Sequence, residues 1–412
     1  MDVDATGDRK LMSMRQAYPG RIIDCCVHHG WTTQNDVVQY MSAGWQEYVA
    51  GTGRPGGIDV VPILPSPYYE HPGADRSNLA RAEPTGVADM KSRVPRSGRL
   101  PGNGADYETI CEQKFRDGDK VDRLILSFDE VMHIPSLPNL HLARNAVKAA
   151  NDWTIDRWLD GRDGRLYSLM LVPCQEPDAA AAEIKRVGRH PRVVGVLLGS
   201  NGLDKPYGHS VYHPIYAAAA ELDLVVVIHA GGQGPNNLSH PTGGGLPTTY
   251  SEYHLLLAQP LMTHIVSLIG QGVFEKFPEL RVLLVGAGVA WIPSLLWRFD
   301  NEYRARRRDA PWLRAEPSEY FRRHFRVSTY PLDKPAHSGD LLKLLEAFGG
   351  LESVLCFGSG FPYWDMDEVG DIADRLPAAW GESIFYENTS RLFRWGSLPT
   401  IAESGRPQPL SR

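Results

Sequence analysis

The sequence has no long hydrophobic run, and this absence argues against a membrane-spanning helix. Its longest uncharged apolar stretch, Val282 to Trp297, contains two glycines and a proline. It is shorter than the roughly 20 residues that cross a bilayer. The first ten residues, MDVDATGDRK, are polar, so we expect no signal peptide. These features predict a soluble, cytoplasmic protein without a membrane partner.

Cysteines are few and charge is close to balanced. Five cysteines in 412 residues, two of them the neighbours Cys25 and Cys26, do not form a disulfide framework, so we expect reduced thiols. The 43 Lys and Arg against 49 Asp and Glu give a net charge of −6, which provides no attraction to nucleic acid. The arginines between Arg304 and Arg326 are interleaved with acidic residues, which indicates a solvated surface.

Short β-branched runs alternate with helix-like segments along most of the chain. Most of these runs are continuously apolar, which is typical of parallel strands that are buried on both faces. The pattern predicts an α/β fold, a (β/α)₈ barrel of distorted TIM type. An open doubly wound sheet is the alternative, although no glycine-rich dinucleotide fingerprint follows an early strand. The expected strands are Arg21–Val27, Arg123–Phe128, Leu166–Pro173, Val193–Leu198, Leu224–His229, Leu280–Val285, Phe325–Tyr330 and Ser353–Gly358.

The helix-like segments lie between these strands and are limited by proline, glycine and charged residues. The expected helices are Pro177–Arg189, Pro214–Leu222, Leu255–Phe277, Trp291–Arg308, Gly339–Phe348 and Asp367–Arg375.

One barrel domain accounts for most of the chain. We expect a flexible N-terminal tail over 1–20, a single domain over 21–396 and a C-terminal tail over 397–412. Residues 51–120 are rich in Gly, Pro and Arg and predict a long irregular insertion after the first strand. This insertion is interpreted as a functional loop or lid at the barrel mouth, and the alternatives are a surface excursion or an oligomer contact. A homo-oligomer is expected.

Three side chains form a candidate metal site. Cys26 and His28 are two residues apart at the end of the first strand and therefore point to the same side. His229 ends the fifth strand, at the barrel end where active sites lie. Thiolate and imidazole predict one divalent ion with an open coordination position, zinc being favoured and copper a competitor. The alternative for the Cys-x-His pair is a buried thiol beside a hydrogen-bonded imidazole.

Several long motifs resemble the amidohydrolase superfamily, in particular the amidohydrolase-2 branch that includes aminocarboxymuconate semialdehyde decarboxylase and hydroxybenzoate-type decarboxylases. They are IIDCCVHHGW, VVVIHAGG, the segment from TTYSEYH through WRFDNEYRA, PSEYFRRHFRVSTYPLD, FGSGFPYWDMDE and IFYENTSRLF. The resemblance extends from about Ile22 to Trp395. It implies a distorted (β/α)₈ barrel with a divalent metal at its C-terminal mouth.

The chain departs from the family pattern at three positions. Cys26 stands where the first strand of the family usually carries His or Asp, and Gly286 stands where a His or Glu often follows strand six. Gly360 stands where the family has an Asp that contacts the metal and takes a proton from water. Glycine does neither, so ordinary metal-hydroxide hydrolysis is not expected. The missing bulk at both glycines predicts a wider pocket.

His254 is the candidate acid or base, because it lies in TTYSEYH after the loop that leaves His229. Glu252 is two residues away, where it can orient the imidazole ring or itself act in catalysis. Four aromatic residues are expected to bind a planar aromatic substrate by stacking, although packing against the insertion is the alternative. They are Tyr253, Tyr330, Tyr363 and Trp364.

These residues favour a metal-dependent enzyme of non-hydrolytic type that acts on a small aromatic acid or amide. The reaction is expected to be either a decarboxylation or a ring-closing cyclodehydration of the oxazole type, and by analogy with biosynthetic relatives it is expected to belong to secondary metabolism. Both use a Lewis acid and neither needs a metal-bound hydroxide as nucleophile. The alternatives are a hydrolase in which Glu252 or His254 replaces the missing Asp, and a non-catalytic binding relative.

Overall fold

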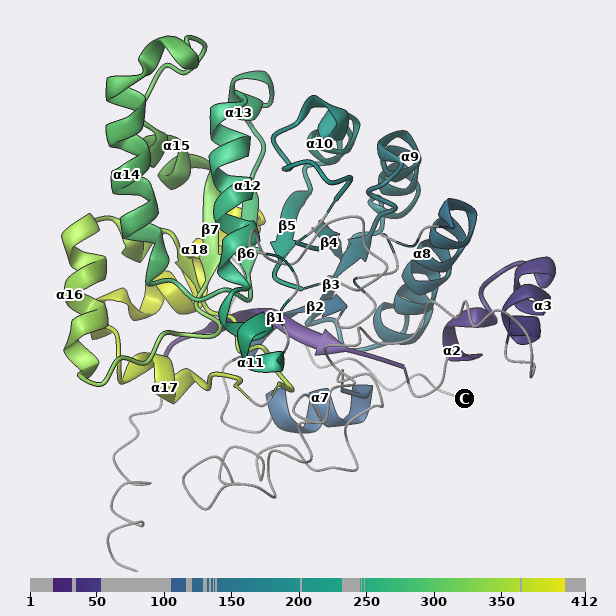
Figure 1. Ribbon diagram of the computed structural model, residues 1–412. Coiled ribbons are helices and arrows are strands. Elements are labelled where there is room, and N and C mark those ends of the chain that lie inside the picture. The colour runs from purple at the N-terminus through teal and green to yellow at the C-terminus, as the bar shows by residue number, and fades with distance from the viewer. Residues whose placement is uncertain are drawn as a thin grey trace, which may run out of the picture.

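The computed structural model describes residues 18–31, 35–52, 105–115, 121–128, 132, 135, 137, 139–200, 202–231, 245, 247, 249–363 and 365–396. Within these residues one sheet of eight parallel strands follows the chain order from β1 to β8 (Figure 1). This order confirms the predicted barrel class. The strands are β1 (Ile22–His29), β2 (Val121–Phe128), β3 (Leu166–Leu171), β4 (Val193–Leu198), β5 (Val225–His229), β6 (Val282–Val285), β7 (Phe325–Ser328) and β8 (Leu355–Cys356).

The sheet closes through backbone hydrogen bonds between its first and last strands. Cys25 N donates to Phe357 O at 2.9 Å, and His28 N donates to Phe361 O at 2.7 Å. Gly360 N, after β8, donates to the carbonyl oxygen of Cys26 in β1 at 2.9 Å. The open-sheet alternative is therefore wrong. The closure also brings the chain after β8 directly against the end of β1.

An outer layer of helices surrounds the strands, as Figure 1 shows. All side chains of β1, β4, β5 and β6 are buried, because barrel interior and helix layer cover opposite faces of each strand. The main outer helices are α8 (Leu140–Thr154), α9 (Pro177–Val187), α10 (His213–Glu221), α12 (Ala258–Gly270), α14 (Trp291–Ala305) and α16 (Ser338–Phe348). Shorter helices are α2 (Asn35–Val38), α3 (Ala43–Thr52), α7 (Tyr107–Lys114), α11 (Tyr250–Leu255), α13 (Val273–Lys276), α15 (Pro317–His324), α17 (Val369–Ala373) and α18 (Asn388–Leu392).

The predicted helix Leu255–Phe277 is wrong as a single element. The chain forms α11, α12 and α13 instead, and Gly272 separates the last two in a left-handed conformation with φ +72°. Helices α8 and α15 were not predicted. Helix α8 is amphipathic, and Asn139 caps its start by accepting a hydrogen bond from Leu142 N through its side chain.

Part of the predicted irregular insertion is helical. Ala105 pairs with His29 in a parallel bridge, and the Asp106 side chain then caps α7 by accepting from Thr109 N. The last residue of this helix, Lys114, donates to Asp24 Oδ2 at 3.1 Å and to Ser359 Oγ at 2.8 Å. The segment is thus anchored to the seam between β1 and β8. Residues 53–104 and 116–120 of the insertion, and the tails at 1–17 and 397–412, lie outside the described residues.

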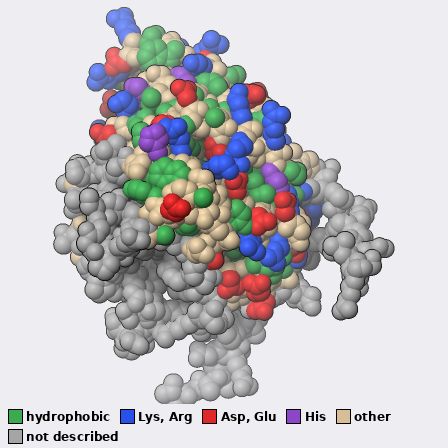
Figure 2. All heavy atoms as spheres, turned by 90° about the vertical axis from the view of Figure 1, so that its right-hand side faces the viewer, with side chains coloured by type: hydrophobic (Ala, Val, Ile, Leu, Met, Phe, Trp, Pro, Cys, Tyr) green, Lys and Arg blue, Asp and Glu red, His purple; other side chains and the backbone are tan. Residues whose placement is uncertain are grey.

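Opposite charges alternate on the surface that Figure 2 shows. Arg186 pairs with Asp152 and Glu183 at 2.7 Å between α8 and α9. In the arginine-rich region Arg304 pairs with Glu316 at 2.7 Å. Within the described part of the chain, no helix is long and apolar enough to cross a membrane.

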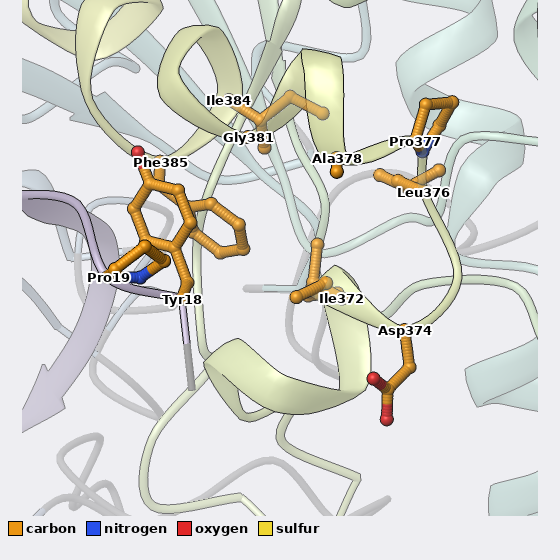
Figure 3. A pocket seen from close by; sticks show the side chains of 11 residues that line it. Tyr18, Pro19, Ile372, Asp374, Leu376, Pro377, Ala378, Gly381, Ile384 and Phe385 are labelled. Atoms are coloured by element: carbon orange, nitrogen blue, oxygen red, sulfur yellow. The ribbon is translucent and has the colours of Figure 1, made fainter. Parts of the chain in front are cut away.

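A cavity of about 490 Å³ is lined by Tyr18, Pro19 and residues between Ile372 and Phe385 (Figure 3). The Tyr18 ring stacks on Phe385 at 4.5 Å between centroids on one side of it. Asp374 is the one carboxylate among its lining residues, and the rest of the lining is mainly apolar. The candidate ligands Cys26, His28 and His229 are not part of this lining.

Candidate metal centre

The three predicted ligands converge at the carboxyl ends of β1 and β5. Cys26 Sγ lies 3.2 Å from His28 Nε2 and 3.6 Å from His229 Nε2. One ligand atom from each residue lies within 4.8 Å of the other two, and all three side chains are buried. This is the arrangement of a three-ligand site with space for one cation.

Strand geometry explains how β1 supplies two ligands and excludes its next histidine. Cys26 and His28 share one side of the strand, whereas His29 points to the other. Its Nδ1 lies 2.9 Å from Ser127 O and its Nε2 lies 3.0 Å from Thr154 Oγ1, within a cluster of tryptophan rings. Burial lowers the pKa of His29 to about 4. It is therefore a neutral packing residue between the barrel and α8.

His229 is held with its Nε2 directed at Cys26. Its Nδ1 donates to Ala230 O at 2.7 Å, which fixes the tautomer and leaves the Nε2 lone pair for a cation. Burial lowers the pKa of this imidazole to about 4, so the ring is neutral at pH 7. Both features suit metal ligation.

Two residues that sequence reasoning missed fix the end of β5. Ser200 Oγ accepts from Gly231 N at 2.9 Å, and Ser200 N donates to Gly231 O at 2.9 Å. His264 Nε2, from α12, donates to Ser200 O at 2.6 Å. Burial lowers the pKa of His264 to about 4, which keeps it neutral. No local motif marks either residue, because their partners are about 30 to 60 positions away in the chain.

The predicted widening of the pocket at the two glycines is wrong. A Cβ built on Gly360 would lie 2.1 Å from Tyr330 Cε2, so the tyrosine ring already fills that position. A Cβ on Gly286 would lie 3.1 Å from His229 Cε1. Both glycines have positive φ, +66° and +85° respectively, which disfavours larger residues. The space left by the missing carboxylate is therefore occupied rather than open.

His254 lies close to a carboxylate that the sequence did not suggest. Its Nε2 is 3.2 Å from Asp365 Oδ2, and a quarter of its side chain is exposed. Tyr330 Oη donates to Asp365 Oδ1 at 2.9 Å. Glu252 instead forms a capping box with Thr249, accepting from Thr249 N at 3.0 Å at the start of α11. The carboxylate beside His254 is thus Asp365.

The four aromatic residues predicted to bind substrate differ in their contacts with the candidate metal ligands. Tyr363 packs edge-on against His28 at 4.6 Å between centroids, and it stacks with Tyr330 at 6.2 Å. Tyr253 is buried in α11. Trp364 lies outside the described residues. Two of the four predicted rings, Tyr330 and Tyr363, therefore contact each other, and Tyr363 contacts the candidate ligand His28.

Comparisons with known proteins agree with the barrel. A family model described as Amidohydrolase matches residues 123–395. The chain is 26% identical over 278 residues to γ-resorcylate decarboxylase from Rhodococcus jostii, covering 63% of this chain and 79% of the relative.

Solved structures show the same fold. 5-Carboxyvanillate decarboxylase from Sphingomonas paucimobilis superposes with a TM-score of 0.59 at 20% identity, covering 91% of this chain and 99% of that one. The enzyme of the same name from Novosphingobium aromaticivorans, solved with manganese and 4-hydroxy-3-methoxy-5-nitrobenzoic acid, gives a TM-score of 0.58 at 17% identity, with 92% and 97% covered.

Proposed function

This chain belongs to the amidohydrolase family, and from that premise we propose that it is a metal-dependent decarboxylase of a small aromatic acid. One observation carries the proposal: the Tyr330 ring stands where the strand-eight carboxylate of a hydrolase would project from position 360. Without that carboxylate nothing at this position takes a proton from water. A decarboxylation needs no such base, and the γ-resorcylate and 5-carboxyvanillate relatives are named for this reaction.

Cys26, His28 and His229 would hold the metal. The fit rests on their buried donor atoms and on the His229 Nδ1 hydrogen bond, which directs Nε2 at the shared position. A bound divalent ion would supply a Lewis acid for the oxygen atoms of the substrate. The Cys26 thiolate favours zinc, whereas the Novosphingobium relative contains manganese, whose preferred ligands are oxygen atoms.

The protein residues would position an aromatic ring and deliver one proton. Tyr363 and Tyr330 offer faces and edges for stacking beside His28. The bond between the ring carbon and the carboxylate breaks, and CO₂ leaves. The electron pair stays on the ring carbon, which takes a proton from His254. His254 then regains a proton from solvent, so the net change is one proton consumed for each CO₂ released.

The test is CO₂ release from a panel of aromatic acids with a hydroxyl group beside the carboxylate, using protein loaded with zinc or manganese. We expect turnover of at least one such acid and poor hydrolysis of simple aryl esters and amides. Vigorous ester or amide hydrolysis without CO₂ release would contradict the proposal and favour the hydrolase alternative. Formation of a dehydrated ring from an aromatic amide would favour the cyclase alternative.

His254→Ala tests the proton donor separately. Removal of a general acid should lower the rate roughly 10²–10⁴-fold and leave the metal content unchanged. Glu252→Ala is the matched control. Glu252 lies in α11, the same helix as His254, and its carboxylate takes part in the capping box at the start of that helix. Full activity of His254→Ala would show that this residue is not the donor, and loss of metal would make it a ligand.

A further inference from the structure

Asp365 joins two side chains that come from different parts of the barrel. One carboxylate oxygen accepts the phenol proton of Tyr330 at 2.9 Å, and the other lies 3.2 Å from His254 Nε2. Tyr330 and Asp365 are buried, whereas His254 keeps a quarter of its side chain exposed. The carboxylate therefore connects an interior phenol with an imidazole that reaches solvent.

The segment that carries Asp365 is fixed on both sides. Tyr363 O accepts from Met366 N at 3.2 Å, and Asp367 N donates to Ser359 O at 2.9 Å. The buried Asp367 carboxylate accepts from Leu332 N at 2.7 Å, which ties this segment to the loop after β7. These hydrogen bonds hold the backbone around Asp365, and the Tyr330 phenol contacts its carboxylate.

The Tyr330 end of this chain reaches the metal centre. Its ring covers Gly360, whose N–H donates to Cys26 O at 2.9 Å. The same ring stacks with Tyr363, which contacts His28. A movement of the Tyr330 phenol would therefore change the packing against a ligand, and Asp365 is the group that holds this phenol.

We propose that Asp365 is the positioning residue of the site: it fixes His254 in the tautomer with the proton on Nε2 and locks Tyr330 over Gly360. The inference rests on the proposed function, since it assigns the reactive nitrogen of the proposed proton donor. In that tautomer the proton on Nε2 faces Asp365 Oδ2, 3.2 Å away, and Nδ1 is the nitrogen that exchanges a proton. The Nδ1–H bond of the protonated ring breaks, the proton goes to the ring carbon that loses CO₂, and solvent returns a proton to Nδ1.

The arrangement explains how the chain functions without the strand-eight carboxylate. Asp365 lies five residues after Gly360 in the sequence. Its carboxylate acts through His254 and Tyr330 instead of contacting the metal ligands. A carboxylate at position 360 and the Tyr330 ring exclude each other sterically. The Tyr330 ring over Gly360 and the carboxylate of Asp365 therefore together replace the single carboxylate side chain that position 360 lacks.

The test is Asp365→Asn in the full-length, metal-loaded protein. The amide of Asn has one acceptor oxygen where the carboxylate has two. With that oxygen accepting from Tyr330 Oη, the NH₂ group faces Nε2 and donates to it, so we expect the His254 tautomer to change and kcat to fall at least about 10²-fold. KM and metal content should stay near those of the parent. Asp374→Asn is the matched control, since it removes a carboxylate that faces the cavity of Figure 3, and it should leave kcat unchanged.

The tautomer is measured by ¹⁵N NMR of histidine-labelled protein, with the His254 signals assigned by their loss in His254→Gln. In the parent we expect the proton on Nε2 of the neutral ring. A proton on Nδ1 in the parent, or an unchanged tautomer and kcat in Asp365→Asn, would overturn the inference. The NMR readout needs no turnover, so absence of decarboxylation with the expected tautomer contradicts the proposed function only. If Asp365→Asn does not fold, the His254 tautomer in the parent decides whether the inference holds. Tyr330→Phe keeps the Asp365 carboxylate and should show the same tautomer as the parent.

Discussion

Gly360 has no side chain, yet the space that a side chain would occupy at this position is filled. The Tyr330 ring covers the glycine, and the backbone there has φ +66°. Tyr330 and Gly360 lie in the segments that follow the neighbouring strands β7 and β8, which brings the ring onto the glycine. A carboxylate at this position would have to displace a buried aromatic ring that is hydrogen-bonded to Asp365.

Gly360→Asp should therefore destabilise the protein rather than restore hydrolysis. Insertion of a side chain into a packed site costs about 1–3 kcal/mol, and the left-handed backbone adds about 1 kcal/mol. Thermal unfolding of Gly360→Asp and Gly360→Ala should show similar losses, because the clash begins at Cβ. Combination of Gly360→Asp with Tyr330→Ala should cost less than the sum of the single changes. A fully stable Gly360→Asp protein with raised hydrolytic turnover would contradict this interpretation.

The two adjacent cysteines provide a matched pair of variants. Cys26 points at His28 and His229, whereas Cys25 lies on the other side of the strand, where burial raises its thiol pKa well above the usual value. Cys26→Ser should lower metal occupancy from about one per chain to a small fraction, because a neutral hydroxyl replaces a thiolate. Cys25→Ser should bind metal like the parent. Elemental analysis of both proteins decides, and equal occupancy in the two would show that the Cys26 thiol is not a ligand.

Among the elements, α7 shows what a glycine- and proline-rich stretch can conceal. The composition of 51–120 predicted an irregular insertion, yet Asp106 caps a helix that begins at Tyr107. Its anchor is the contact of Lys114 with the buried Asp24 carboxylate, 90 residues earlier in the chain. A helix of eight residues is too short to be stable alone, so its formation depends on that anchor.

Lys114→Ala should release α7 while the barrel stays folded. Loss of one partner leaves the Asp24 carboxylate buried beside Ser359 without its cation, which costs roughly 3–5 kcal/mol in a fully buried pair and less here because Lys114 is partly exposed. We expect faster amide hydrogen exchange over 105–115 than in the parent. Lys148→Ala, which breaks an exposed pair with Asp152, is the control and should change little. Unchanged exchange in Lys114→Ala would show that other contacts hold the helix.

Helix α12 stabilises the loop after β4 through His264, and this contact should depend on pH. Burial lowers the pKa of His264 to about 4 from an unfolded value near 6.5, so the unfolded chain binds this proton first. The contribution is complete above pH 6.5 and is lost as pH falls toward 4, by up to about 3 kcal/mol. His264→Gln should be less stable than the parent at pH 7.5 and should lose less stability by pH 4.5. Parallel pH curves of Tm for the two proteins would contradict this assignment.

For the whole molecule, the sequence was sufficient to predict the barrel and the convergence of Cys26, His28 and His229, the candidate ligands. Continuous apolar runs mark strands that are buried on both faces, and strand alternation puts Cys26 and His28 on one side. It was not sufficient for contacts that arise only when the barrel closes. Tyr330 on Gly360, and Asp365 beside His254, join positions that are 30 and 111 residues apart, and no local pattern records such pairs.

The most direct test of the proposed decarboxylase follows the proton to the ring carbon. Metal-loaded protein is incubated in D₂O with 2,6-dihydroxybenzoate and with other hydroxybenzoic acids, and the products are examined by NMR. We predict one deuterium at the vacated ring carbon for each CO₂ released, and neither deuterated product nor CO₂ in His229→Ala, which lacks one of the three candidate ligands. Absence of CO₂ release by the metal-loaded parent across these acids, or equal release by His229→Ala, would contradict a metal-dependent decarboxylase.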